Sequence, residues 1–156
     1  MPTYATVIGT ITRITNQERD CCERMISLRT DQGTVNVLLT ADTLVVDSRT
    51  LQVGMRIAAF YDFNAPVPLI YPPQYRALII AVLQPGDQVF IGLFNRNLVS
   101  ADNTLRLQMG PRTQITTGNG QNCRCCPENH TLLVIYTNST RSIPAQTTPR
   151  RVVVIC

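Results

Sequence analysis

The sequence predicts an all-β, helix-poor protein that consists of two tandem small antiparallel barrels, each similar to an OB fold. Three observations lead to this prediction. Apolar and polar residues alternate with the two-residue period of strands in most segments. No run of ten or more residues has the apolar spacing of an amphipathic helix. The second half of the 156-residue chain resembles the first half, which indicates an internal repeat with domains at residues 1–83 and 84–156.

The segments of the first half that have strand composition follow one another closely. Two β-rich runs flank the turn DQG, which ends at Gly33 and predicts a hairpin. Residues 40–50 are the best helix candidate, but they are too few and too rich in β-branched residues. The predicted strands are residues 4–14, 25–30, 34–40, 55–63 and 75–83.

The second half repeats three stretches of the first half in the same order. The matches are VIGTITRI with FIGLFNRNL, GTVNVLLTADTLVV with NTLRLQMGPRTQIT, and RIAAFYDFNAPVPLIYPPQYRALIIAV with TLLVIYTNSTRSIPAQTTPRRVVVIC. Without a gap, the third match places Tyr61 on Tyr136 and Arg76 on Arg151. Residues 83–88, LQPGDQ, join the halves through a Pro-Gly turn. Several short strands per half favour a small barrel, and a single sandwich is the alternative.

The charge pattern is unusual, because all 14 basic residues are arginine and none is lysine. The net charge is +4, and charged residues make up only 15% of the chain. A polar but weakly charged surface tolerates close packing against its own copies. With no lysine, no tryptophan and few aromatic residues, the chain lacks a strong nucleic-acid footprint, so nucleic acid is not the expected partner.

Six cysteines fall where the two halves differ in sequence, which places them in inserted loops or at the end of the chain. They are Cys21, Cys22, Cys123, Cys125, Cys126 and Cys156. Their spacing lacks the Cys-x2–4-Cys pairs of zinc sites and the Cys-x-x-Cys of redox enzymes, so we expect no metal and no cofactor. Acidic residues are scattered and His130 is the one histidine, so we expect no catalytic residues and no enzyme.

With metal binding and redox catalysis not expected, disulfide bonds are the remaining role for these cysteines. Adjacent cysteines seldom bond to each other, because the small ring strains the peptide between them. Adjacent and terminal cysteines suit cross-links between subunits, so intermolecular disulfides are the favoured interpretation. Three internal disulfides are the alternative.

Two proline-rich loops, residues 64–75 and 140–150, precede the last strand of each half. In an OB-like barrel such a loop borders the ligand face, where Tyr61, Tyr71, Tyr75 and Arg76 can stack against bases. Packing of these side chains onto their own barrel is the alternative. The gap-free match places Tyr71 on Gln146 and Tyr75 on Arg150, so the second half does not repeat this set.

Three stretches carry a resemblance to a known family: FYDFNAPVPLIYPPQYRALIIA, SIPAQTTPRRVVVIC, and LFNRNLVSADNTLRLQM between them. They resemble an uncharacterised family of conserved hypothetical proteins from clostridial Firmicutes, over about Gly9 to Cys156. The resemblance implies no activity and no catalytic residues, and it implies a spore-forming anaerobe as the source. In style alone, the cysteine usage is similar to that of spore appendage subunits, which polymerise through strand addition and disulfides.

These observations predict a structural, self-assembling fibre subunit whose partners are copies of itself. Strand edges at residues 3–9 or 150–155 would pair between subunits, and the cysteines would lock the contacts. Such a fibre would lie outside the cell or on a spore surface, although the first ten residues lack the features of a signal peptide. No stretch is long and apolar enough to span a membrane. The alternative is a soluble tandem OB-like module that binds single-stranded nucleic acid or another extended ligand.

Overall fold

The protein is all-β and poor in helix, as the sequence predicts. The computed structural model describes residues 3–17, 20–123 and 127–156. Within these residues the only helical element is one short 3-10 turn, η1 (Val46–Ser48). None of the described residues forms a helix long and apolar enough to cross a membrane. The chain divides into two compact units, Met1–Gln84 and Pro85–Cys156.

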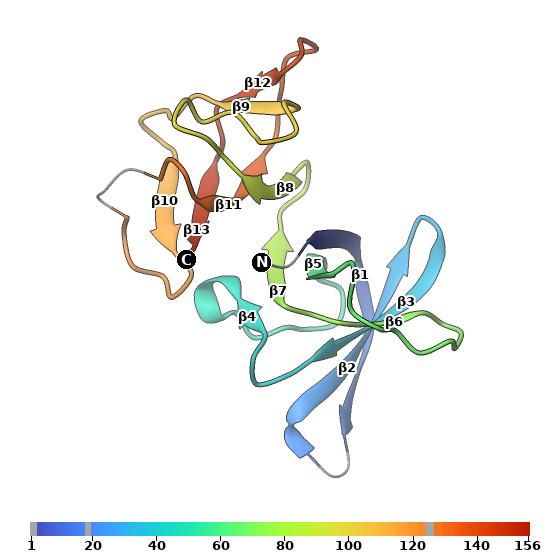
Figure 1. Cartoon of the computed structure of the whole chain (residues 1–156). Coiled ribbons are helices and arrows are strands. Elements are labelled where there is room, and N and C mark those ends of the chain that lie inside the picture. The colour runs from blue at the N-terminus through green and yellow to red at the C-terminus, as the bar shows by residue number, and fades with distance from the viewer. Residues whose placement is uncertain (1–2, 18–19, 124–126) are drawn as a thin grey trace. The chain divides into compact units, whose positions relative to one another are not determined.

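The first unit is built on one mixed sheet in the order β4-β7-β5-β1-β2-β3-β6. Its strands are β1 (Tyr4–Gln17), β2 (Asp20–Thr30), β3 (Gly33–Leu39), β4 (Leu44–Val45), β5 (Arg56–Asp62), β6 (Gln74–Arg76) and β7 (Ile79–Leu83). Figure 1 shows the long strands β1, β2 and β3 in blue. Most neighbours are antiparallel, but β3–β6 and β4–β7 are parallel. β5 lies between β1 and β7, and its residues 57–60 are all buried.

The second unit repeats this pairing with shorter strands. Its strands are β8 (Gln88–Leu93), β9 (Leu105–Leu107), β10 (Gln114–Thr117), β11 (Thr131–Tyr136), β12 (Ala145–Thr147) and β13 (Arg151–Ile155). One sheet has the order β10-β13-β11-β8, and β12 and β9 form a separate parallel pair. Each unit has its own apolar core, around Ile26 and Leu28 in the first and around Phe94 and Leu132 in the second.

The hydrogen bonds of the two units confirm the repeat but correct its alignment. Thr43 Oγ1 donates to the carbonyl of Ala77, and Thr113 Oγ1 donates in the same way to the carbonyl of Pro149. The gap-free match would instead pair Ala77 with residue 152. The second proline-rich loop is therefore three residues shorter than the first, and pairing Arg76 with Arg151 was wrong.

The strand pairing does not bear out two closed tandem barrels. In the first unit, β4 and β6 end the order, and each pairs with a single strand. In the second unit, the described strands fall into two separate sheets. The sequence could not reveal this, because alternation specifies which face of a strand is buried and leaves its neighbours open.

The predicted edge strands also differ from those in the structure. The segment 150–155 lies in β13, which pairs with both β10 and β11, so it offers no free edge. The segment 3–9 lies in β1, which pairs with β5 from Tyr4 onwards but with β2 only from Thr10 onwards. Of the two predicted edge segments, only the part of β1 before Thr10 has an open side in the described part of the chain.

Candidate functional site

Two tyrosines of the predicted ligand face lie against each other. Tyr61 is on β5 and Tyr75 is on β6, and their ring centroids are 4.1 Å apart with an angle of 15° between the planes. The two strands are four places apart in the sheet order, so the sheet curls until β6 returns over β5. Stacked rings of this kind contribute about 0.5–1.5 kcal/mol beyond the area that they bury.

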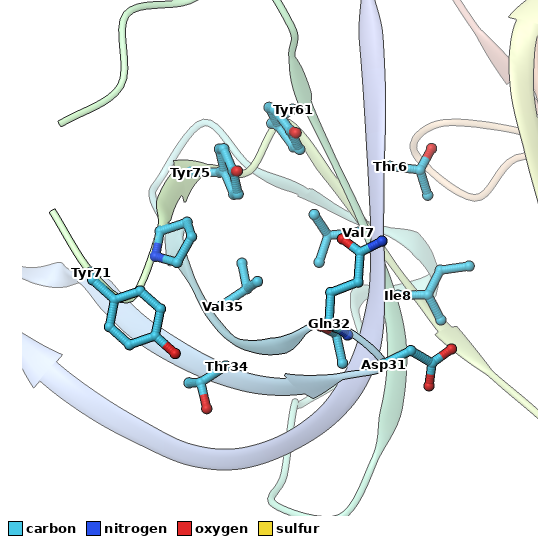
Figure 2. A pocket seen from close by; sticks show the side chains of 12 residues that line it. Thr6, Val7, Ile8, Asp31, Gln32, Thr34, Val35, Tyr61, Tyr71 and Tyr75 are labelled. Atoms are coloured by element: carbon cyan, nitrogen blue, oxygen red, sulfur yellow. Dashed lines mark hydrogen bonds between the residues drawn. The ribbon is translucent and has the colours of Figure 1, made fainter. Parts of the chain in front are cut away.

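These rings form one wall of a hollow that we call the tyrosine groove. Figure 2 shows Tyr61 and Tyr75 together on one side, Tyr71 on another, and Val7 and Val35 between them. The groove has a volume of about 420 Å³. Its lining residues are Thr6, Val7, Ile8, Thr30, Asp31, Gln32, Thr34, Val35, Tyr61, Tyr71, Pro73 and Tyr75. Three of the four residues predicted for a ligand face therefore share one concave surface.

The fourth predicted residue, Arg76, lies in a neighbouring hollow. This second hollow has a volume of about 350 Å³ and is also lined by Tyr61 and Tyr75. Arg76 does not line the tyrosine groove, whose lining contains no arginine. The only carboxylate of the groove is that of Asp31, which the sequence analysis did not single out.

The open side of β1 forms part of the groove. Thr3 accepts a hydrogen bond from the amide of Phe63, and the amide of Ile11 donates to Met55, so the odd-numbered residues of β1 face β5. Backbone groups alternate in direction along a strand, so those of Thr6 and Ile8 point away from β5. Among the described residues, no strand pairs with this side of β1 before Thr10.

The strands β1 and β2 lie close together at Gly9 and separate beyond it, where the turn that follows β2 begins. Gly9 is buried, and a Cβ atom at this position would lie 2.7 Å from the carbonyl oxygen of Arg29. Past this crossing, β2 ends at Thr30 and the chain turns through Gly33, which has a φ of 114°. The Thr30 hydroxyl donates to the Gly33 carbonyl and holds the turn. The opening between β1 and this turn is the tyrosine groove.

The proline-rich loop beside the groove exposes an unusual amount of apolar surface. Leu69 is fully exposed, and Tyr71 is 84% exposed. Val67 and Ile70 of this loop are also exposed, as is Phe63 directly before it. Prolines limit the freedom of the loop, so these side chains are presented to solvent at little entropic cost.

Burial and the neighbouring ring affect the ionisation of Tyr61. Desolvation raises the pKa of its phenol above the ordinary value, and the nearby Tyr75 raises it further. Tyr61 therefore stays neutral at physiological pH and keeps an O–H group that can donate a hydrogen bond.

The second unit does not repeat the groove. The corrected alignment places Tyr71 on Ile143 and Tyr75 on Thr147, where the gap-free match gave Gln146 and Arg150. A hollow of about 420 Å³ does lie at the second proline-rich loop. Its lining is made only of Gln, Asn, Ser and Thr residues: Gln108, Thr137, Asn138, Ser139, Thr140, Gln146, Thr147 and Thr148.

The cysteines occupy three places. Cys21 and Cys22 are exposed at the start of β2, and Cys156 is exposed at the end of the described chain. None of these three is in a disulfide in the part of the chain that the structure describes. Cys123 is half-buried and packs against the second core. Cys125 and Cys126 lie outside the described residues.

Cys21 and Cys22 form a small exposed cluster with Asp20. One ligand atom from each of the three lies within 4.8 Å of the others, and the Asp20 carboxylate accepts a hydrogen bond from the amide of Cys22. A hydrogen bond with the Cys21 side chain, together with the charges of Cys21 and Asp20, raises the pKa of the Cys22 thiol. The cluster has ligand atoms of the kind that bind metals, but it offers only three of them and all three residues are exposed.

The sequence predicts the tyrosines as a ligand face and residues 3–9 as a free strand edge, but it does not predict that the two share one groove. The alternating pattern gives no signal for this, because it also occurs in a strand that is paired on both sides. Asp31 lies in the predicted turn DQG, where aspartate is common, so the sequence does not indicate a binding role for it. No known protein-family model matches the chain, and a search of curated proteins found no significant similarity.

Proposed function

We propose that the first unit is a binding module that takes an extended ligand in the tyrosine groove. The observation that carries this proposal is that three tyrosines and the open side of β1 line one hollow. Concave sites with aromatic walls and a few convergent polar groups are typical of ligand sites. The exposed apolar loop beside the groove adds contact area for a ligand longer than the hollow itself.

The groove can be tested by titrating the full chain with ligands of different chemistry. We would use a fifteen-residue oligothymidylate, cellohexaose and a random peptide library displayed on phage. Tyr71→Ala is the diagnostic variant, because its ring is 84% exposed and its loss should leave the fold intact. Ile143→Ala is the matched control, because it removes an 87% exposed side chain at the equivalent place in the second unit.

The proposal expects at least one probe to bind, with affinity reduced at least tenfold by Tyr71→Ala and unchanged by Ile143→Ala. Aromatic contacts with a ligand are worth about 1–3 kcal/mol each, which corresponds to this loss. Failure of all three probes to bind, or equal affinity for both variants, would remove the proposed function.

A second candidate function is a self-assembling subunit of a fibre outside the cell or on a spore surface. The observation that favours it is the exposure of Cys21, Cys22 and Cys156, which leaves three thiols accessible to other copies. The weakly charged, lysine-free surface is compatible with contacts between copies. Pairing through the edge of β13 is no longer part of this proposal, because β13 is paired on both sides.

Non-reducing denaturing gels and negative-stain images, each with and without reductant, test the fibre candidate. It expects covalent oligomers that disappear with reductant, and it expects Cys21→Ser, Cys22→Ser and Cys156→Ser to shorten them. Cys123→Ser is the control, because this side chain is half-buried against the core. A monomeric band without reductant, with no filaments in the images, would exclude the fibre.

A further inference from the structure

We infer that the ligand of the tyrosine groove is an extended polypeptide segment that adds to β1 as a strand. This inference rests on the proposed function and names the class of ligand. The first observation concerns the backbone of β1. Its even-numbered residues before Thr10 direct their N–H and C=O groups away from β5. In strand addition, such groups supply the affinity and side-chain pockets supply the specificity.

The position of the groove agrees with this mode of binding. Thr6, Val7 and Ile8 of β1 line it, so a strand that pairs with β1 would lie in the hollow. Side chains alternate along an extended peptide, so every second residue of the ligand would face one wall. Val35, which lies between the rings of Tyr71 and Tyr75, would receive apolar side chains of the ligand.

The charge of the groove disfavours nucleic acid as the ligand and favours a peptide that carries a basic side chain. Single-stranded nucleic acids are bound by positively charged grooves. Among the described residues, no arginine lines this groove, and the one charged side chain that does is the carboxylate of Asp31. The exposed carboxylate would repel phosphates and attract a ligand arginine or lysine. We therefore expect a peptide that alternates apolar and polar residues and carries one basic side chain.

The polar side chains at the rim are available for such a ligand. In the described part of the structure, Thr6, Asp31, Gln32 and Thr34 make no side-chain hydrogen bonds. Side chains of the ligand can therefore form hydrogen bonds with these groups. The turn that carries Asp31 and Gln32 is held by Thr30 and Gly33, so the rim is pre-formed.

Two proline variants separate the backbone of β1 from its side chains. Thr6→Pro removes an N–H that points into the groove, and proline is tolerated where a strand's N–H has no partner. Val7→Pro removes an N–H that faces β5 and should destabilise the first unit. Thr6→Val keeps the N–H and removes only the hydroxyl, which makes it the matched control for Thr6→Pro.

The experiment uses the phage-displayed random peptide library on the immobilised full-length protein, and enriched peptides are then synthesised. We expect peptides with alternating apolar residues and one basic residue. Thr6→Pro and Tyr71→Ala should each weaken their binding at least tenfold, while Thr6→Val and Ile143→Ala leave it within a factor of three. Asp31→Asn should remove the preference for the basic residue. The amide of Thr6 should exchange at least tenfold more slowly in the saturated complex.

Other outcomes would refute strand addition alone, or strand addition together with the proposed function. Peptides that bind Thr6→Pro as well as the unchanged protein would refute strand addition, provided that circular dichroism shows the variant to be folded. Should Thr6→Pro fail to fold, unchanged exchange of the Thr6 amide in the peptide complex would refute it. If oligothymidylate or cellohexaose binds in a Tyr71-dependent way and no peptide does, the inference is wrong and the proposed function stands. If no probe binds, both are wrong.

Discussion

Tyr61 and Tyr75 stack face to face with their ring centroids 4.1 Å apart, although their strands are not neighbours in the sheet. The contact joins β5 in the middle of the sheet to β6 at its end. It therefore holds the curl of the first unit, and the same rings form one wall of the tyrosine groove. A pair of residues that stabilises the fold thus also shapes the candidate site.

Replacing Tyr75 by alanine should reduce the stability of the first unit. The change removes the stacking contact and part of the buried area, at a cost of about 2–3 kcal/mol. Tyr75→Phe keeps the ring and should cost less than about 1 kcal/mol. Chemical denaturation followed by circular dichroism measures both values. Equal losses for the two variants would show that the hydroxyl, and not the stacked ring, carries the stabilisation.

Asp102 should make the second unit less stable in acid. Burial alone would raise its pKa, but hydrogen bonds from Ser100, from Thr104 and from the backbone lower the pKa below the ordinary value of 3.8. The folded state therefore favours the charged form. Its contribution is present above pH 3.8 and is lost as the pH falls through the lower folded value.

Asp102→Ala tests this contribution. Relative to the unchanged protein, Asp102→Ala should lower the free energy of unfolding at neutral pH by about 0.5 kcal/mol, a small value because Asp102 is exposed and solvent screens its charge. The difference should shrink toward zero in strong acid. Asp42→Ala is the control, because Asp42 is an exposed aspartate in a turn of the first unit. A difference that stays constant from neutral pH to strong acid would contradict the assignment.

The ion pair between Arg150 and Asp87 should be sensitive to loss of one partner. Arg150 Nη2 lies 2.6 Å from Asp87 Oδ2, and the Asp87 side chain is only 1% exposed. Arg150→Ala leaves that carboxylate in the interior, and we expect a loss of about 2–3 kcal/mol in the free energy of unfolding. Adding Asp87→Asn should recover part of the loss, because an amide costs less to bury than a charge. A double variant less stable than Arg150→Ala would contradict this explanation.

Gly9 and Gly92 occupy equivalent places in the two units, opposite Ile57 and Leu132. A Cβ at Gly9 would lie 2.7 Å from the backbone oxygen of Arg29, whereas at Gly92 it would lie 3.0 Å from the ring of Phe90. Backbone cannot move as easily as a side chain, so Gly9→Ala should cost about 3 kcal/mol and Gly92→Ala about 1 kcal/mol. Thermal unfolding of both variants checks the order, and the reverse order would contradict it.

Cys22 should react slowly with alkylating reagents near neutral pH. Its thiol has a raised pKa because of its hydrogen bond with Cys21 and the charges of Cys21 and Asp20. The thiolate is the reactive form, so the rate should rise only at a higher pH than for a simple cysteine peptide. Mass spectrometry after timed treatment with iodoacetamide measures the rate at each site. Cys21→Ser should shift the profile of Cys22 to lower pH, and an unchanged profile would contradict the role of Cys21.

The internal repeat shows which positions could be aligned from the sequence and which could not. Matching Gly9 with Gly92 was correct, because the two glycines occupy equivalent positions in paired strands, opposite Ile57 and Leu132. Matching Arg76 with Arg151 was wrong, because a shorter loop changes the offset and sequence similarity alone cannot place the gap. The sequence predicts Tyr61, Tyr71, Tyr75 and Arg76 as one ligand face because a proline-rich loop borders that face in an OB-like barrel. The structure brings the three tyrosines together, whereas Arg76 lines a different hollow.

By itself, the sequence determined that the chain is all-β and that it contains a repeat. These properties depend on local alternation and composition, which any single strand records. The tertiary structure alone decided that β1 is open before Thr10, that β13 is closed on both sides, and that Tyr61 meets Tyr75 across a curled sheet. Pairing is made by backbone groups that every residue carries, so residue types do not encode which strand becomes a neighbour.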